Sequence, residues 1–150
     1  MTQHLNDFLQ NNEHKLFATA QGTHIHALLQ QIVFDNENPS GDSKLYSIIQ
    51  QHPELQRYFT KNTRTEVPIA GFLNNIFVSR RIDRLLIDTN NKTVEFLDYK
   101  TDTDTNIFRD KYTKQLTEYA RLLRSAYPKY KITGFILWTQ NWQLEQIISI

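Results

Sequence analysis

The chain has 150 residues, of which 39% are hydrophobic and 22% are charged, a balance typical of one globular domain over residues 1–150 and not of a disordered chain. It has no cysteine, which excludes a disulfide framework and a thiolate metal site. The formal net charge is only +1, so any binding of nucleic acid must come from a local basic patch.

The first third of the sequence is predicted to be helical. Residues 1–20 are expected to form an N-terminal helical extension. A second helix is expected over His24–Val33, because its apolar residues recur at helical spacing. A loop over Asn36–Asp42, with Pro39 and Gly41, then precedes a further helix that ends near Pro53.

After Arg64 the pattern changes to short runs of β-branched and aromatic residues, which predict strands. The apolar stripe of Phe108–Tyr127 predicts one long helix, which Pro128 ends. This order predicts a mixed α/β domain whose sheet is flanked by helices. The predicted strands are Glu66–Ile69, Ile76–Ser79, Ile82–Ile87, Val94–Tyr99, Lys131–Thr139 and Leu144–Ile150.

Charged residues stand inside two of the apolar strands. Asp83 interrupts one strand, and Asp98 and Lys100 end the next. Because strand side chains alternate between faces, Asp98 and Lys100 share a side, and pairing of the two strands would bring Asp83 beside Asp98. Carboxylates on adjacent strands suit Mg²⁺, and a lysine can hold a phosphate oxygen or orient a water. The set therefore predicts phosphodiester hydrolysis.

A structural explanation of the same residues stays open at this point. Asp83 could pair with Arg84 or Arg81 on a solvated strand, and Asp98 with Lys100 could form a surface ion pair of little energetic value. D-x-K by itself is a weak motif.

The arrangement resembles the signature of the PD-(D/E)XK nucleases. The segments around it resemble the nuclease domain that ends RecB- and AddA-type helicase–nucleases. One departure is that Arg80 and its neighbours stand where this family usually has a glycine. The resembling segments are Gly22–His26 (G-x-x-x-H), Glu66–Pro68 (E-x-P), Arg81–Leu85 (R-I-D-R-L), Asp98–Thr101 (D-Y-K-T), Tyr112–Tyr119 (Y-x-x-Q-L-x-x-Y), Tyr127-Pro128 and Ile136–Thr139.

This resemblance implies a restriction-endonuclease-like fold, a mixed β-sheet core flanked by helices. It also implies a deoxyribonuclease dependent on Mg²⁺ or Mn²⁺, such as the exonucleases of double-strand break repair. Asp83 and Asp98 would be metal ligands, together with His26 and the Tyr99 carbonyl. Asp83, Asp98 and Lys100 would be the catalytic residues. Without the resemblance, His26 reads as an ordinary residue of a helix surface or core.

Further residues would surround this centre. Glu66 would lie near the metal in an outer layer, and Gln115 and Tyr119 would line the side that faces DNA, although Tyr119 also fits the apolar core stripe. Lys111, Lys114 and Arg121 lie along one side of the same helix and are candidates for phosphate contacts, with a solvated helix face as the alternative.

The expected partners are DNA and, by resemblance, a helicase subunit or a second nuclease subunit. The chain has no G-x-x-x-x-G-K-[ST] phosphate loop, so we expect an excised domain, a split subunit or a remnant. A catalytically silent DNA-binding or assembly remnant is the alternative function, and the intact set of His26, Asp83, Asp98 and Lys100 argues against it. No signal peptide or membrane span is recognisable, so we expect a cytoplasmic protein without a membrane partner.

Overall fold

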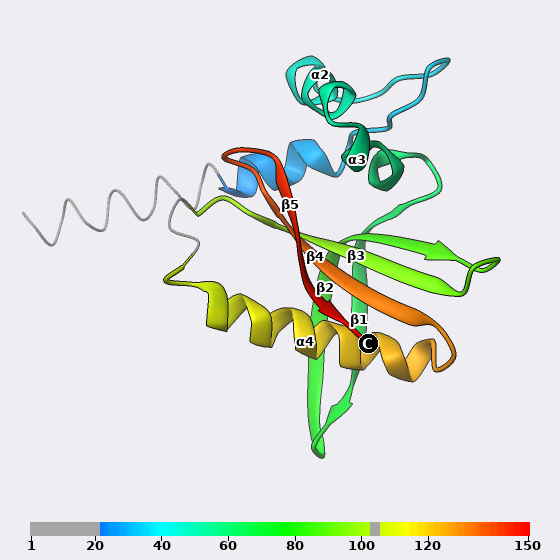
Figure 1. Cartoon of the computed structure of the whole chain (residues 1–150), viewed down its shortest axis with the longest axis vertical. Coiled ribbons are helices and arrows are strands. Elements are labelled where there is room, and N and C mark those ends of the chain that lie inside the picture. The colour runs from blue at the N-terminus through cyan, green and yellow to red at the C-terminus, as the bar shows by residue number, and fades with distance from the viewer. Residues whose placement is uncertain (1–21, 103–105) are drawn as a thin grey trace, which may run out of the picture.

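The computed structural model describes residues 22–102 and 106–150 (Figure 1), so the helical extension predicted for residues 1–20 lies outside the described part. The first described element is a helix at residues 22–29. The elements that follow are α2 (Ser43–Gln51), α3 (Pro53–Gln56), a short 3₁₀ turn η1 (Arg57–Phe59), β1 (Arg64–Leu73), β2 (Ile76–Asp88), β3 (Thr93–Lys100), α4 (Arg109–Ala126), β4 (Lys131–Trp138) and β5 (Gln143–Ser149).

The strands form one five-stranded sheet in the order β1-β2-β3-β4-β5. Only β3 and β4 run parallel, because α4 carries the chain back between them, and all other neighbours are antiparallel hairpins. The predicted mixed α/β class, with a sheet flanked by helices, is confirmed.

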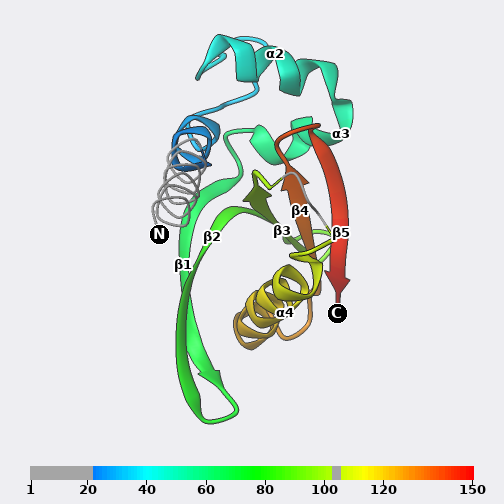
Figure 2. The same cartoon turned by 90° about the vertical axis from the view of Figure 1, so that its left-hand side faces the viewer.

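Each face of the sheet has its own apolar core. On one face α4 packs against β2, β3 and β4 through side chains such as Leu116, Phe96 and Ile136. On the other face the helix at 22–29 and the α2–α3 region pack on β3 and β4 through side chains such as Leu29 and Leu97. Figure 2 shows α4 and the N-terminal helices on opposite sides of the strands. The central strand β3 is therefore covered on both faces.

Three predicted elements differ from the structure by more than one residue at an end. The helix expected to reach Val33 ends at residue 29, because the backbone of Val33 instead pairs with Ser40. The runs Ile76–Ser79 and Ile82–Ile87 belong to the single strand β2. Arg80 and Arg81 interrupt the apolar pattern between the two runs, but they pair with β1 and continue the strand. β1 likewise extends beyond the predicted Glu66–Ile69 at both ends.

The predicted long helix is confirmed as α4, with small differences in its buried stripe. Tyr112, Leu116 and Leu123 are buried as expected, but Ala126 is exposed because the helix ends there, beyond the sheet-facing turns. Among the described residues, no helix is both long and apolar enough to cross a membrane.

Candidate active site

The strands β2 and β3 separate at Asp83. Their ladder runs only as far as the pair Arg84↔Leu97. Leu85 and Ile82 both pack in the core on the α4 side, although residues three apart in a regular strand face opposite sides. β2 therefore turns at Asp83 as it leaves β3, which leaves unpaired backbone and a gap between the two strands.

Asp83 directs its side chain into this gap. Its Oδ2 accepts a hydrogen bond of 2.8 Å from the backbone N–H of Tyr99, and the side chain is 13% exposed. Continuing the ladder by one position sets Asp83 against Asp98, so the two carboxylates belong to facing positions. The hairpin pairing predicted from the sequence is present.

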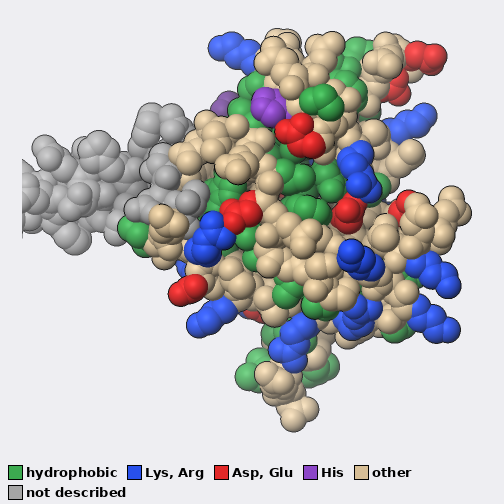
Figure 3. All heavy atoms as spheres, viewed as in Figure 1, with side chains coloured by type: hydrophobic (Ala, Val, Ile, Leu, Met, Phe, Trp, Pro, Cys, Tyr) green, Lys and Arg blue, Asp and Glu red, His purple; other side chains and the backbone are tan. Residues whose placement is uncertain are grey.

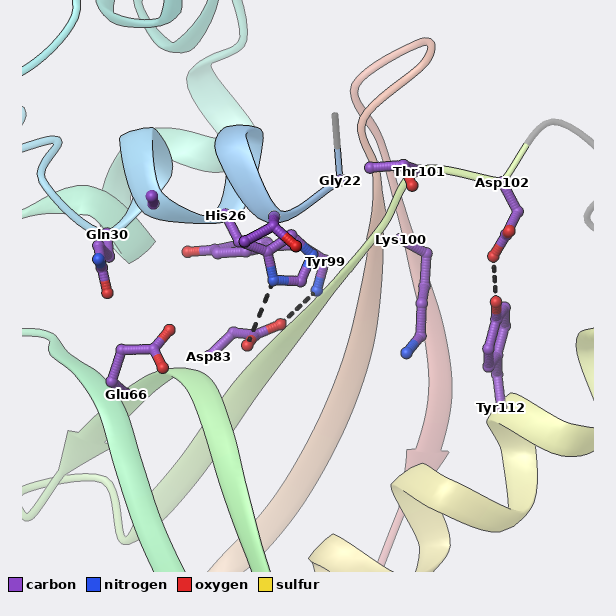
Figure 4. Close-up of a pocket in the computed structure, with 12 residues that line it drawn as sticks. Gly22, His26, Gln30, Glu66, Asp83, Tyr99, Lys100, Thr101, Asp102 and Tyr112 are labelled. Carbon is purple, nitrogen blue, oxygen red and sulfur yellow. Dashed lines mark hydrogen bonds and ion pairs between the residues drawn. The ribbon is translucent and has the colours of Figure 1, made fainter. Parts of the chain in front are cut away.

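His26 approaches the same carboxylate from the helix at residues 22–29. Its Nδ1 lies 3.8 Å from Asp83 Oδ1, and its ring meets the Tyr99 ring edge-on at 5.4 Å between centroids. Figure 4 shows the imidazole lying between Tyr99 and Asp83. The predicted convergence of His26 and Asp83 is thus seen in the geometry, although their separation is that of a loose ion pair.

Glu66 lies across from Asp83 on β1 in a strained backbone conformation. Its φ is +52°, in the left-handed region, which costs a residue with a Cβ about 1 kcal/mol. The side chain lines the same cavity as Asp83, and its Oε2 lies 3.5 Å from Arg81 Nη1. Local strain beside a cluster of charged side chains is typical of functional sites.

Asp98 and Lys100 form a close pair below this gap. Lys100 Nζ lies 2.7 Å from Asp98 Oδ2, and the two side chains are 16% and 6% exposed. Although Nζ is this near, no donor in the described residues is aligned for a hydrogen bond to Asp98 Oδ2. The pair is therefore buried, whereas the alternative explanation from the sequence was that Asp98 and Lys100 form an ion pair on the surface.

Lys100 is held on its other side by α4. Its Nζ donates a 3.0 Å hydrogen bond to Gln115 Oε1 and lies 4.3 Å from the centre of the Tyr112 ring. Gln115 in turn donates to the hydroxyl of Tyr119, which is only 4% exposed. Gln115 therefore orients the lysine, and Tyr119 supports Gln115 from the core, whereas the resemblance placed both on a DNA-facing side.

Burial sets the charge states at this site. Desolvation, followed by the negative charge of Asp98, raises the pKa of Asp83 to about 7. Desolvation lowers the pKa of His26 even though Asp98 opposes the shift, so the imidazole is largely neutral at neutral pH. A neutral imidazole and closely spaced carboxylates are a donor set that can bind a cation.

These side chains surround a cavity of about 530 Å³ (Figure 4). His26 and Glu66 line it from two sides with Asp83 between them, and Lys100 lines it from β3. Asp98 itself does not line the cavity and lies buried beneath it. Asp102 and Tyr112, which sequence reasoning missed, also line it and are hydrogen-bonded to each other.

Arg84 is a further residue that sequence reasoning missed as part of the site. It is 2% exposed and donates to the Tyr99 hydroxyl at 3.1 Å, to Thr63 Oγ1 at 2.9 Å and to the Leu29 carbonyl at 2.7 Å. Its guanidinium also lies 4.4 Å from the centre of the Phe59 ring. Leu29 ends the helix that carries His26, so Arg84 ties that helix to β2 and β3.

These contacts exclude one explanation of the sequence. Asp83 was open to pairing with Arg84 or Arg81, but the guanidinium of Arg84 is bonded to Tyr99, Thr63 and Leu29, and Arg81 pairs with Glu66. The signal that could have revealed Arg84 is its place directly before the apolar run Leu85–Ile87, since a charge beside residues that enter the core needs fixed partners.

We expect Arg84→Ala to lower the free energy of unfolding by about 3 kcal/mol, because it leaves the Leu29 carbonyl and its other partners buried without donors. Urea denaturation measures this. The matched control Arg81→Ala, at an exposed position on the same strand, should change stability by no more than about 0.5 kcal/mol. Equal losses in the two variants would contradict the role of Arg84 as a buried tie.

The donor chemistry fits a hard divalent cation. Asp98 Oδ2 is a buried carboxylate oxygen without an aligned donor, and Asp83 is a carboxylate crowded by a second negative charge. The Tyr99 N–H points toward β2, and since a strand residue directs both backbone groups to one side, its carbonyl does so as well. In residues 22–102 and 106–150, however, no group of three or more His, Asp or Glu side chains is already arranged to hold a metal ion.

The candidate DNA-contacting residues of α4 lie outside this cavity. Lys111, Lys114 and Arg121 are exposed, and the last two line a groove of about 430 Å³ between α4 and the β1–β2 hairpin. Glu118, which lies between Lys114 and Arg121 in the sequence, forms an ion pair with Arg80, whose Nη2 is 2.9 Å from Glu118 Oε1. Lys114 and Arg121 are therefore the exposed cations of this side of α4, where Asp110 in the first turn is an exposed carboxylate.

No known family model matches the chain, and no curated protein is significantly similar to it.

Proposed function

We propose that the protein is a metal-dependent DNA nuclease with a restriction-endonuclease-like fold. One observation carries the proposal: where β2 and β3 separate, Asp83 and Lys100 line one cavity with His26 from a different element, and Asp98 lies buried beside Lys100. Carboxylates and a neutral imidazole beside a lysine form the donor set that metal-assisted phosphodiester hydrolysis requires. The order of the resembling motifs supports the same reaction.

Asp83 and Asp98 would hold the metal ion, Mg²⁺ or Mn²⁺, with His26 and the Tyr99 carbonyl as further ligands. The bound ion would supply Lewis-acid stabilisation of charge on the phosphate. Lys100, held by Gln115, would place its ammonium against a phosphate oxygen and stabilise the charge that develops during cleavage. Glu66 would orient water and His26 at the cavity mouth.

A catalytically silent DNA-binding or assembly module is the second candidate. It is favoured by the absence, among the described residues, of a group already arranged to hold a metal, and by the contact of Lys100 with Asp98. A nuclease assay separates the two candidates, with linear and circular, single- and double-stranded DNA in Mg²⁺, Mn²⁺ or EDTA. We expect cleavage that EDTA abolishes. DNA binding without cleavage under every condition would leave only the silent module.

Phosphate contacts along α4 are expected to hold DNA without reading its bases. Replacing Lys111, Lys114 and Arg121 with alanine should weaken DNA binding, and the slope of affinity against salt should fall by roughly one unit per lost contact. Affinity measured across a salt series in Ca²⁺, to prevent cleavage, tests this. The control is Lys44→Ala on α2, an exposed lysine on the opposite side of the sheet. An unchanged slope in the triple variant would place the DNA track elsewhere.

A further inference from the structure

The β1–β2 hairpin extends beyond the rest of the sheet as a two-stranded arm (Figure 2), here called the arm and comprising residues 67–82. β2 has β3 as a neighbour only from Arg84 to Asp88, so its preceding residues pair with β1 alone. Asn74 and Asn75, with φ of +50° and +65°, close the arm as a tight turn suited to a twisted hairpin. The arm is therefore a defined projection and not a loose loop.

Two phenylalanines are exposed near its end. Phe72 and Phe77 are directly opposed in the ladder, 72% and 61% exposed, with ring centroids 5.5 Å apart in an edge-on arrangement. Exposed apolar side chains are visible at the protruding end of the molecule in Figure 3. Within the described part of the chain, rings this exposed offer a large apolar surface to a partner.

The two faces of the arm have different surroundings. Leu73, Ile76 and Val78 turn toward α4 and line the groove beside it. Phe72 and Phe77 alternate with them and so turn away from α4, onto the face that also carries Arg81. Arg81 contacts Glu66 at the candidate active-site cavity, so this outer face runs from the cavity to the phenylalanines. Asp83 and Phe77 are six positions apart along β2, a distance of about 20 Å.

The charge on the outer face of the arm favours a polyanion as its ligand. Residues 67–82 include no acidic residue, and of their two arginines Arg80 is paired with Glu118 on the α4 side, whereas Arg81 is 68% exposed on the outer face and reaches Glu66 only at 3.5 Å. A second copy of this chain would set one positive arm against another. Unpaired nucleotides offer negative phosphates and flat bases together, and the span from cavity to tip fits the short end of the range of about 4–16 nucleotides that such sites cover.

We infer that the outer face of the arm binds single-stranded nucleic acid, with bases stacked on Phe72 and Phe77 and the backbone lying along Arg81 toward the cavity. This deepens the proposed nuclease function and rests on it for the choice of DNA as the ligand. Bases inside a duplex are already stacked on each other, so the phenylalanines would select for unpaired strand.

The test is fluorescence anisotropy of the full chain with labelled oligothymidine of about 15 nucleotides and with a hairpin duplex of similar length, both in EDTA. Phe72→Ala/Phe77→Ala should weaken binding of oligothymidine roughly 30-fold, or about 2 kcal/mol, and leave duplex binding unchanged. Ile76→Ala is the matched control, because Ile76 is 67% exposed at the same tip but on the α4 face, and it should change affinity less than about twofold.

Binding measured in EDTA does not depend on cleavage, so this inference and the proposed function can fail separately. Loss of oligothymidine binding on Phe72→Ala/Phe77→Ala, in a chain that never cleaves DNA, would uphold the arm and overturn the nuclease. If the chain cleaves DNA and Phe72→Ala/Phe77→Ala leaves its oligothymidine binding unchanged, the nuclease is upheld and the arm inference is overturned. The arm inference is also overturned if the wild type binds no oligothymidine, if duplex binding falls equally, or if the change abolishes only self-association of the chain.

Discussion

Lys100→Ala is expected to reduce the rate of DNA cleavage roughly 1,000-fold while DNA affinity in Ca²⁺ stays within a factor of about two. The reason lies in the position of the ammonium, which is buried, aligned by Gln115 and directed at the cavity, where it can meet the charge that develops on the phosphate. An interaction made mainly in the transition state lowers the rate when it is lost and leaves binding nearly intact.

The variant should still fold, because Lys100 is at the end of β3 and its side chain is not part of either apolar core. Far-UV circular dichroism checks the fold, and single-turnover cleavage measures the rate. Gln115→Ala should give a smaller loss, since it releases the lysine from its support without removing it. Lys44→Ala on α2 is the control for the loss of an exposed lysine. Unchanged cleavage by Lys100→Ala would remove this residue from the mechanism.

Asp83→Asn should abolish cleavage and, in EDTA, make the protein more stable at about pH 8. Burial and Asp98 raise the pKa of Asp83 to about 7, well above the value near 3.9 of an unfolded aspartate. The folded protein thus favours the protonated carboxyl. Its stabilising contribution is complete below about pH 4 and is lost progressively as pH rises to 7, a loss on the order of 4 kcal/mol.

The asparagine variant lacks this titration, so its stability relative to the wild type should rise between about pH 4 and pH 7 and then level off. His26 has a lowered pKa, which makes stability fall as the solution becomes acidic, but that effect is common to both proteins and cancels in the difference. Urea denaturation in EDTA at several pH values measures the difference. With Mg²⁺ at about pH 8 the wild type should gain stability and the variant should not.

Asp88→Asn, at the last residue of β2, is the matched control. The backbone and side chain of Asn91 donate to Asp88 and lower its pKa, so this carboxylate stabilises the fold when ionised. The variant should therefore be less stable than the wild type at neutral pH and show no advantage at high pH. A pH-independent difference between Asp83→Asn and the wild type would show that Asp83 is not in a desolvated site beside a second carboxylate.

Periodicity in the sequence was sufficient for the class of fold and most of its elements. The long stripe of α4 and the apolar strands on either side of it carry a strong local signal, because a helix or strand that covers a core must repeat its apolar residues at its own period. Alternation also placed Asp98 and Lys100 on one face, and their contact at 2.7 Å agrees with that expectation. The end of the helix at residue 29 was missed, since the competing pairing of Val33 with Ser40 leaves no periodic trace.

The candidate site shows where sequence ceases to be enough. Residue types identified Asp83, Asp98 and Lys100, and the family resemblance added His26, but only tertiary structure decided that β2 leaves β3 at Asp83 and that His26 reaches it from a helix far away in the chain. The role of Arg84 depends on Leu29, which lies 55 positions away, and the pKa of Asp83 is raised by burial and by Asp98, which belongs to another strand. Local patterns report which face of an element is apolar, whereas desolvation and the meeting of charges depend on how distant elements pack.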